Sequence, residues 1–388
     1  MKQSLESSSY KWLMISLTFI LSFLLHLLLF CTAPMVDHIM GDMGLTNAQF
    51  GIIFSAAMAS LLLLRIPWGI VGDRIGYLKT LRISLIIISI SAIMRGLVDG
   101  YKTFIASQFI LGIGLASLLP CFPLLIREWF SKRSGLATGI YVSGFAIGNG
   151  TALGLTPYLI QIMEWRSVLI LYGTFSLFVT ISWWILAKSE EKTRSEGVAY
   201  TKFFDLIRRK KIIILILLMT ASMGCYDTLA TWMPKVLELR SLSKSPSLFL
   251  SFGFFLSGPS IGYISDKLEN EGILICTMGI LSALSIATII YAPTYLLWII
   301  LILSGFSLMA VLTLTLKIPA SAQDLRKARG KVTGIVSSIS NIGPMLFPVA
   351  FGYLMDITST YILSFLMLVA IVLLIIPPSS RALYDSST

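Results

Sequence analysis

Four ionisable side chains lie inside long apolar segments of the sequence: His26, Arg65, Asp227 and Lys317. A charge in the hydrocarbon core of a membrane is costly, so each such side chain needs a partner, water or a function. Arginine binds anions through two parallel hydrogen bonds, and lysine binds them as a point charge. Histidine and aspartate gain and lose protons. The residue types therefore predict anion binding by Arg65 and Lys317, and proton transfer by His26 and Asp227.

Each of these four residues also has a purely structural interpretation. His26 could be a neutral side chain bonded to a neighbouring helix. Asp227 could reach water at a membrane face, because it lies only seven residues before Pro234 at the end of its apolar segment. The long side chains of Arg65 and Lys317 could extend to the lipid headgroups instead of binding a ligand. The sequence leaves both interpretations open.

The composition places these residues in a membrane protein. The 388 residues are 56% hydrophobic and 13% charged, with a mean hydropathy of +0.86, and a soluble globular protein of this length is far less apolar. Apolar runs of about 20 residues match the thickness of a bilayer and predict helices, since a transmembrane barrel would show short alternating strands. The net charge of +11 does not indicate nucleic-acid binding, because the basic residues lie in short segments beside the apolar runs.

The apolar runs predict an all-α membrane protein with about twelve transmembrane helices. One long hydrophilic stretch, residues 188–211, falls in the middle of the chain. We therefore predict two six-helix domains, residues 1–187 and 212–388, joined by this linker. The predicted spans are residues 12–34, 47–71, 81–99, 103–127, 135–160, 166–187, 212–234, 246–265, 273–292, 295–318, 331–354 and 361–377.

The basic residues predict how the chain is oriented in the membrane. Most of the 30 lysine and arginine residues lie in the tails, in the central linker and in the connections on the same side as the N-terminus. Arg65 is the one cation that the predicted spans place well inside a helix. Because positive residues accumulate on the cytoplasmic side, we expect a multi-pass protein of the cell membrane with both termini and the linker in the cytoplasm.

Three segments of the first half recur in the second half at a nearly constant offset, which indicates a parallel repeat. The offsets lie between 193 and 200 residues. They place His26 opposite Tyr226, next to Asp227, and they place Arg65 opposite Gly258. The recurring pairs are Gly69 and Asp73 with Gly262 and Asp266, residues 135–140 with 330–335, and Pro34 with Pro234.

The connection between the second and third predicted spans has the pattern G-x-x-x-D-R-x-G. Gly69 permits a close helix approach, and Gly76 permits a tight turn. Asp73 can cap the next helix or pair with a cation, and Arg74 follows it directly. The partial copy of this pattern in the second half carries the charged residues Asp266 and Lys267.

The twelve spans, the six-plus-six repeat and this loop together resemble the major facilitator superfamily of secondary transporters. The resemblance covers nearly the whole chain, from Trp12 to about Pro377. It implies a substrate site near the middle of the membrane, between the two halves, and alternating access by rocking of one half against the other. It also implies that the first, fourth, seventh and tenth spans line the site, and that the loop and its copy act as a gating latch.

A shorter resemblance concerns anion binding. Residues 65–69, RIPWG, are similar to the segment of nitrate and nitrite porters whose arginine binds the anion, and the segments 144–150 and 341–343 are loosely similar to their paired glycine-rich signatures. This resemblance points to a small anion as the substrate. The expected substrate-binding residues are Arg65, Lys317, Asn149 and Tyr226.

The sequence thus predicts a proton-coupled secondary active transporter of a small organic or inorganic anion. It has no Walker loop, no G-x-S-x-G motif and no cluster with metal-ligand spacing, so we expect neither an enzyme nor a cofactor. The expected partners are the anion, the proton and the lipid bilayer, without nucleic acid. Two alternatives stay open: efflux of a drug-like cationic or neutral metabolite with Asp227 as the counter-charge, and a sensor or assembly protein on the same scaffold.

Overall fold

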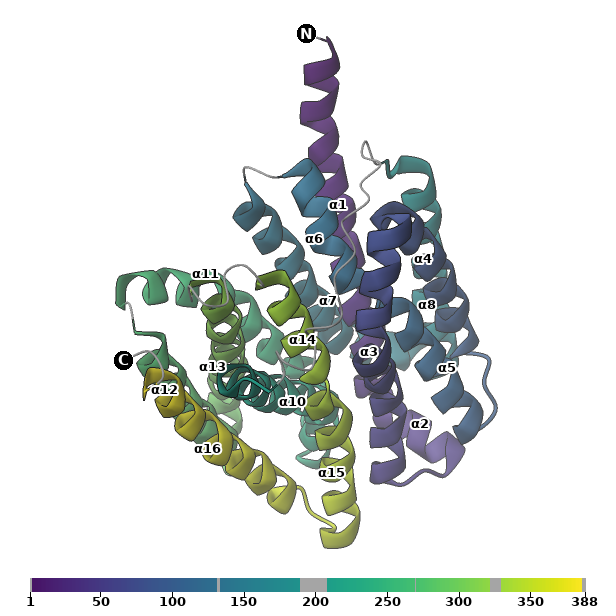
Figure 1. Ribbon diagram of the computed structural model, residues 1–388. Coiled ribbons are helices and arrows are strands. Elements are labelled where there is room, and N and C mark those ends of the chain that lie inside the picture. The colour runs from purple at the N-terminus through teal and green to yellow at the C-terminus, as the bar shows by residue number, and fades with distance from the viewer. Residues whose placement is uncertain (1, 131–132, 189–207, 269, 322–328, 386–388) are drawn as a thin grey trace.

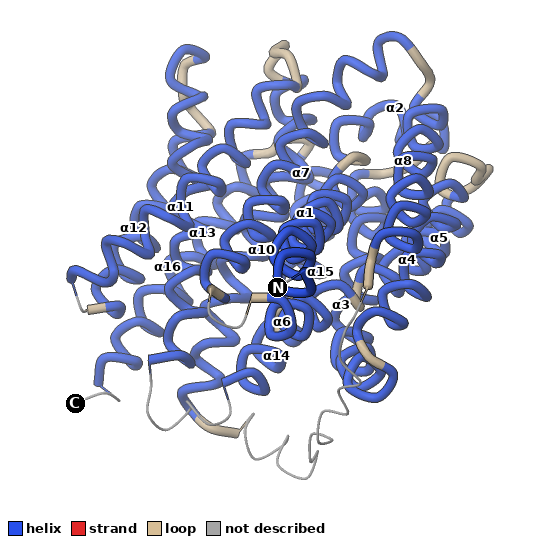
Figure 2. Tube along the Cα trace, turned by 90° about the horizontal axis from the view of Figure 1, so that it is seen from above, coloured by secondary structure: helices blue, strands red, loops and turns tan. Residues whose placement is uncertain are grey.

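A computed structural model of the chain describes residues 2–130, 133–188, 208–268, 270–321 and 329–385. Every regular element in these ranges is a helix (Figure 2), and eleven segments are long and apolar enough to cross a membrane. The all-α membrane fold is therefore confirmed. The α-helices are α1 (Lys2–Phe30), α2 (Val36–Met43), α3 (Asn47–Ile75), α4 (Tyr77–Met94), α5 (Tyr101–Leu115), α6 (Leu118–Trp129), α7 (Ser134–Ile162), α8 (Trp165–Leu186), α10 (Lys210–Leu239), α11 (Leu248–Leu268), α12 (Glu271–Ile289), α13 (Thr294–Ser321), α14 (Arg329–Ile339), α15 (Ile342–Thr358) and α16 (Ile362–Asp385).

The helices form two bundles that lie side by side (Figure 1). We call α1–α8 the N bundle and α10–α16 the C bundle. Across the boundary α3 packs against α15, and α7 packs against α11. The ribbons of the two bundles diverge toward the end that holds the N-terminus and converge at the opposite end, which we call the α2 end. Residues 189–207 of the predicted linker lie outside the described residues, so the domain limits stay a prediction.

The helix boundaries differ from the predicted spans in a few places. The fourth span is divided into α5 and α6 at residues 116–117, and the eleventh is divided into α14 and α15 at residues 340–341. Helix α2 lies in the connection that the predicted spans leave between residues 34 and 47. Helix α3 continues to Ile75 instead of residue 71, so that Gly76, with φ 84°, alone connects it to α4. A positive φ is favourable only for glycine, which confirms the turn predicted at Gly76.

The two bundles repeat the same close helix contacts. A Cβ atom built on Gly112 of α5 would lie 2.5 Å from the backbone oxygen of Ala57 in α3, and one built on Gly305 of α13 would lie 2.0 Å from that of Leu250 in α11. Both residues of the second contact lie 193 positions after those of the first. Helices approach this closely only where a residue has no side chain. The packing therefore supports the predicted repeat.

In the first helix of each bundle the register differs from the predicted one. The backbone oxygen of Phe23 in α1 lies 2.2 Å from a Cβ atom built on a glycine of α7. The backbone oxygen of Thr220 in α10 lies 2.2 Å from a Cβ atom built on a glycine of α15, so the two contacts are equivalent. These two residues are 197 positions apart, not 200. His26 therefore lies opposite Met223, and its predicted pairing with Tyr226 is wrong. The offset of 200 came from Pro34 and Pro234, which are not structurally equivalent. Helix α10 continues through Pro234, whereas α1 ends before Pro34.

We expect Gly305→Ala to destabilise the protein, because the added methyl group would collide with the backbone oxygen of Leu250. Overpacking of this kind costs about 1–3 kcal/mol. Gly139→Ala in α7 is the matched control, since a Cβ atom there meets nothing within 4 Å and alanine favours a helix over glycine by about 1 kcal/mol. Thermal unfolding in detergent, followed by circular dichroism, compares the two. Equal midpoints would contradict the proposed close packing.

Candidate functional site

Arg65 reaches from the N bundle to the C bundle. It lies on α3 and is only 5% exposed, and its Nη1 donates a 2.8 Å hydrogen bond to the backbone oxygen of Ser337 in α14. Its Nε has no hydrogen-bond partner among the described residues. The side chain therefore does not extend to the lipid headgroups, and part of its capacity to donate hydrogen bonds is unused.

The carbonyl of Ser337 is available because the helix is interrupted beside it. In a continuous helix the N–H of Asn341 would bond this carbonyl, but here it bonds the oxygen of Ser338 at 3.2 Å. The side-chain amide of Asn341 donates to the Ser337 oxygen at 2.7 Å and to the Ser338 oxygen at 3.0 Å. Arg65 and Asn341 thus share one carbonyl oxygen at the junction of α14 and α15.

Asp227 of α10 belongs to the opposite bundle and is 7% exposed. Its carboxylate interacts electrostatically with Arg65, but the two groups form no direct ion pair in the part of the chain that the structure describes. No described residue donates a hydrogen bond to this carboxylate. A buried carboxylate without donors is costly, so Asp227 needs water, a proton or a ligand to complete its surroundings.

His26 of α1 lies among aromatic rings. Its ring stacks on Phe145 with a centroid distance of 4.8 Å, and the rings of Phe30 and Phe254 lie 5.6 and 6.3 Å away. The buried Nδ1 has no partner among the described residues, so no neighbouring helix satisfies it. His26 also interacts electrostatically with Arg65, which assigns both side chains to one polar region.

A second polar group joins α7 and α11 across the boundary between the bundles. Asn149 is fully buried, and its Oδ1 accepts a 2.8 Å hydrogen bond from Ser251. Its Nδ2 has no partner among the described residues. The hydroxyl group of Tyr226 lies near Ser251 without making a hydrogen bond of acceptable geometry, and the Tyr226 ring contacts Phe254 at 5.5 Å.

These contacts connect five of the six predicted substrate and proton residues in one region between the bundles. Four of their side chains each present a buried polar atom without a partner among the described residues: His26 Nδ1, Arg65 Nε, Asn149 Nδ2 and Tyr226 Oη. The arrangement has hydrogen-bonding capacity and charge but no nucleophile activated by a base. It is suited to binding a ligand. We call it the central polar site, which consists of His26, Arg65, Asn149, Tyr226 and Asp227.

Lys317 is not brought to the central polar site. Its Nζ donates a 2.8 Å hydrogen bond to the Ser265 hydroxyl group and lies 3.7 Å from a carboxylate oxygen of Glu271. These partners belong to the end of α11 and the start of α12. The lysine lies near the end of α13, where it joins the ends of three helices.

A second buried arginine was missed in the sequence. Arg95 lies near the end of the third predicted span and is the C-cap of α4, where it is 0% exposed. It donates to the backbone oxygen of Leu28 at 2.7 Å, to Gln108 Oε1 at 3.3 Å and to the Cys31 sulfur at 3.8 Å. Leu28 lies in the last turn of α1, so Arg95 caps the negative end of that helix. A cation just outside the end of a helix is thus at least as deeply buried as Arg65.

A family model described as the Major Facilitator Superfamily matches residues 18–325 of the chain. The chain belongs to the Major Facilitator Superfamily. The predicted family is therefore confirmed.

Two curated relatives of this facilitator are named as transporters. The chain is 24% identical to a "Probable nitrate transporter NarT" of Staphylococcus epidermidis, over 87% of each protein. It is 22% identical to a "Probable L-galactonate transporter" of Escherichia coli K12, over 60% of this chain and 56% of that protein. The second alignment thus spans little more than half the length of the relative.

A crystal structure of a bacterial homologue of the human lysosomal transporter Spinster, in an inward-facing conformation, has the same fold. Its TM-score is 0.75, with 16% identity over 97% of each chain. At this identity the likeness supports the fold alone.

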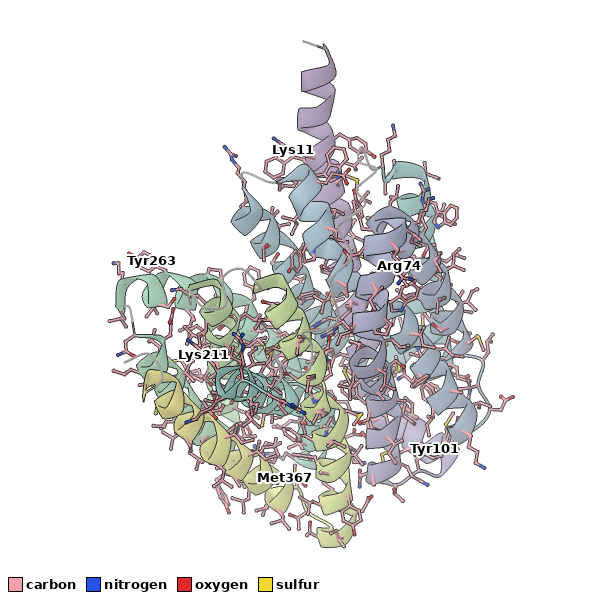
Figure 3. The ribbon with its side chains drawn as sticks, viewed as in Figure 1. Lys11, Arg74, Tyr101, Lys211, Tyr263 and Met367 are labelled. Carbon is pink, nitrogen blue, oxygen red and sulfur yellow. The ribbon has the colours of Figure 1, made fainter. Side chains whose placement is uncertain are left out.

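The loop pattern of the facilitator lies in the N bundle toward the end that holds the N-terminus. Figure 3 shows Arg74 on the same side as Lys11 and away from Tyr101. Gly76 is the N-cap of α4 and supplies no side-chain cap. The latch roles of Asp73 and Arg74 stay predictions.

The other loop residues differ in outcome. A Cβ atom on Gly69 would meet Pro120 at 3.6 Å, an ordinary contact distance, so the close helix approach at Gly69 stays a prediction. In the second copy, Lys267 lies with its Nζ 4.5 Å from the ring centroid of Tyr263. The side chain of Asp266 lies outside the described residues. A gating role for this copy stays a prediction.

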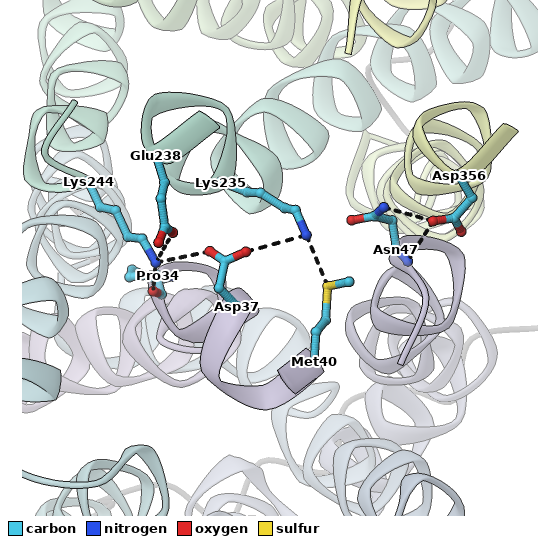
Figure 4. Close-up of polar contacts among 8 residues, drawn as sticks. All are labelled: Pro34, Asp37, Met40, Asn47, Lys235, Glu238, Lys244 and Asp356. Carbon is cyan, nitrogen blue, oxygen red and sulfur yellow. Dashed lines mark hydrogen bonds and ion pairs between the residues drawn. The ribbon is translucent and has the colours of Figure 1, made fainter. Parts of the chain in front are cut away.

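At the α2 end a helix cap joins the two bundles (Figure 4). Helix α3 begins at Asn47, and the first N–H groups of a helix have no partner within it. Asp356 of α15 accepts hydrogen bonds from the backbone N–H and side-chain amide of Asn47, at 2.9 and 2.7 Å, and from the N–H of Ala48 at 2.8 Å. A carboxylate of the C bundle thus caps the positive end of a helix of the N bundle. We call this contact the inter-bundle cap.

A charged cluster lies beside the inter-bundle cap (Figure 4). Asp37 of α2 pairs with two lysines of the C bundle, Lys235 at 3.4 Å and Lys244 at 3.0 Å. Lys244 also donates to the Pro34 carbonyl oxygen at 3.3 Å and pairs with Glu238. This cluster explains why two lysines lie on the side of the membrane where the sequence has few positive residues.

We expect Asp356→Asn to weaken the inter-bundle cap, because the amide has no charge and one acceptor oxygen fewer. Asp356 is exposed, which puts the loss near the lower end for a helix cap, about 0.5 kcal/mol or about twofold in the equilibrium between closed and open α2 ends. Pulsed electron paramagnetic resonance between spin labels at Ile162 and Tyr295, both exposed, measures the separation of the bundles there. Longer distances should become more populated.

The matched control for this change is Asp42→Asn. Asp42 pairs with Arg166, which lies in the same bundle, so its loss should leave the distance distribution unchanged. If Asp356→Asn has the same distance distribution as the unaltered protein, the inter-bundle cap does not hold the two bundles together at the α2 end.

Proposed function

We propose that this protein is a proton-coupled transporter that moves a small anion across the cell membrane by alternating access. The observation that carries the proposal is the buried Arg65 guanidinium, which retains an unused Nε and interacts electrostatically with Asp227, a carboxylate that accepts no hydrogen bond from the described residues. Both bundles contribute to the site, so rocking of the bundles would expose it to one side at a time. The relatives named for nitrate and galactonate transport agree with an anionic substrate.

Charge balance supports the coupling to protons. With Asp227 deprotonated and no anion bound, the charges of Arg65 and Asp227 offset each other. A bound monoanion would add one negative charge in surroundings of low dielectric constant, which is strongly unfavourable. A proton taken up by Asp227 or His26 restores neutrality. We therefore infer that one anion and one proton load the site together.

Orientation and gating form the rest of the proposal. Both termini lie in the cytoplasm according to the positive-inside pattern, so the α2 end faces the outside. The inter-bundle cap and the Asp37 cluster would then close the outer side while the site communicates with the cytoplasm. The loop with Asp73 and Arg74, together with Asp266 and Lys267, would close the inner side in the opposite conformation. We leave Lys317 out of the proposed site, because Ser265 and Glu271 hold its ammonium group.

Arg65→Gln should abolish anion uptake, and Arg65→Lys should reduce it about tenfold or more, since lysine keeps the charge but loses the planar donor group. Uptake of nitrate and galactonate into proteoliposomes measures the effect. Arg82→Gln is the matched control, because the partners that the described residues give Arg82, Trp184 and Ala187, belong to its own bundle. If both Arg65 variants transported every anion at the original rate, the proposal would fail.

Asp227→Asn should uncouple transport from the proton, because an amide cannot titrate. Accumulation driven by a pH gradient should fall at least tenfold, while exchange of labelled for unlabelled anion across the membrane continues. A second candidate function, efflux of a cationic compound, is favoured by the unbonded Asp227 carboxylate. It predicts the opposite result, namely loss of all transport in Asp227→Asn and no requirement for Arg65.

A further inference from the structure

The central polar site has two polar ends. Arg65 and Asp227 form one end, where the two charges interact across the bundle boundary. Tyr226 and Asn149 form the other end, on either side of Ser251. Tyr226 and Asp227 are successive residues of one α-helix, so their side chains leave it about 100° apart. They therefore serve different ends of the site.

A chain of aromatic contacts from both bundles links the two ends, because His26 also interacts with Arg65. The ring of Phe254 in α11 contacts Tyr226 at 5.5 Å on one side and His26 at 6.3 Å on another. His26 in turn stacks on Phe145 of α7 at 4.8 Å. Such rings favour contact with a flat, apolar ligand surface.

Each polar end retains an unused hydrogen-bonding group. Arg65 Nε is unpartnered at the charged end, and Asn149 Nδ2 and Tyr226 Oη are unpartnered at the other. Unpartnered buried polar groups are unfavourable, so the ligand that fits best meets both ends at once. An ion as small as nitrate has oxygens around a single atom and meets only one end.

We propose that the substrate is an organic carboxylate with a flat body of about one ring and a hydroxyl group at the end away from the carboxylate. The carboxylate binds Arg65, the body lies against Phe254 and His26, and the hydroxyl group bonds Asn149 Nδ2 and the Tyr226 hydroxyl group. This assignment rests on the proposed function of the same site. 4-Hydroxybenzoate has this chemistry and serves as the probe.

Calorimetric titration of the purified protein with 4-hydroxybenzoate, benzoate and nitrate tests the assignment. We expect 4-hydroxybenzoate to bind about tenfold more tightly than benzoate, with nitrate weaker than both. Tyr226→Phe removes only the hydroxyl group and should reduce this tenfold preference to about twofold or less, by weakening 4-hydroxybenzoate and not benzoate. Tyr158→Phe, on an exposed position of α7, is the matched control. Equal binding of 4-hydroxybenzoate and benzoate would overturn the assignment.

A second variant tests the aromatic body separately. Phe254→Leu should lower the affinity for 4-hydroxybenzoate severalfold and leave that for 6-hydroxyhexanoate, a flexible chain with the same end groups, nearly unchanged. An equal loss for both ligands would exclude the stacking contact. If nitrate binds in an Arg65-dependent way and 4-hydroxybenzoate does not bind, this assignment is wrong while anion transport stands. If no anion requires Arg65, both are wrong.

Discussion

The hydrogen bond from Arg65 to the Ser337 carbonyl oxygen is the contact on which the central polar site depends. A guanidinium group keeps its charge in almost any surroundings, so its burial between apolar helices requires partners from both bundles. The helix break after Ile339 leaves the Ser337 carbonyl oxygen to Arg65 and the Asn341 side chain, and Asp227 supplies an opposite charge without a direct ion pair among the described residues. The protein therefore satisfies the arginine only in part, and the remaining capacity determines which ligands the site accepts.

The fold and much of the site could be predicted from the sequence. Apolar runs of membrane length are conspicuous, and a charge such as Arg65 or Asp227 inside one of them is rare enough to indicate a function. The repeat was also visible, because residues 135–140 recur as residues 330–335, and the equivalent close contacts at Gly112 and Gly305 agree with it. These signals are local, since each depends on residue type and spacing alone.

The parts that could not be predicted depend on contacts between distant segments. Ser337 contributes a backbone oxygen, which every residue has, and only the helix break makes it available. From the sequence, Asp356 is an ordinary carboxylate near the end of a helix. Its role as a cap depends on the start of α3 at Asn47, which is 309 positions away in the sequence. From the sequence, Arg95 is a cation near the end of a span, and Lys317 is a candidate for anion binding. Their actual places follow from neighbours that the sequence does not reveal.

The inter-bundle cap depends on the sequence very differently on its two sides. In the C bundle it requires a carboxylate at Asp356. In the N bundle it uses mainly the backbone N–H groups of residues 47 and 48, which every amino acid except proline provides. Substitutions at these two positions therefore leave most of the contact in place, whereas the Asp37 cluster is weakened by a change on either side. The two contacts at the α2 end thus differ. The inter-bundle cap tolerates most substitutions on its N-bundle side, whereas the cluster around Asp37 tolerates them on neither side.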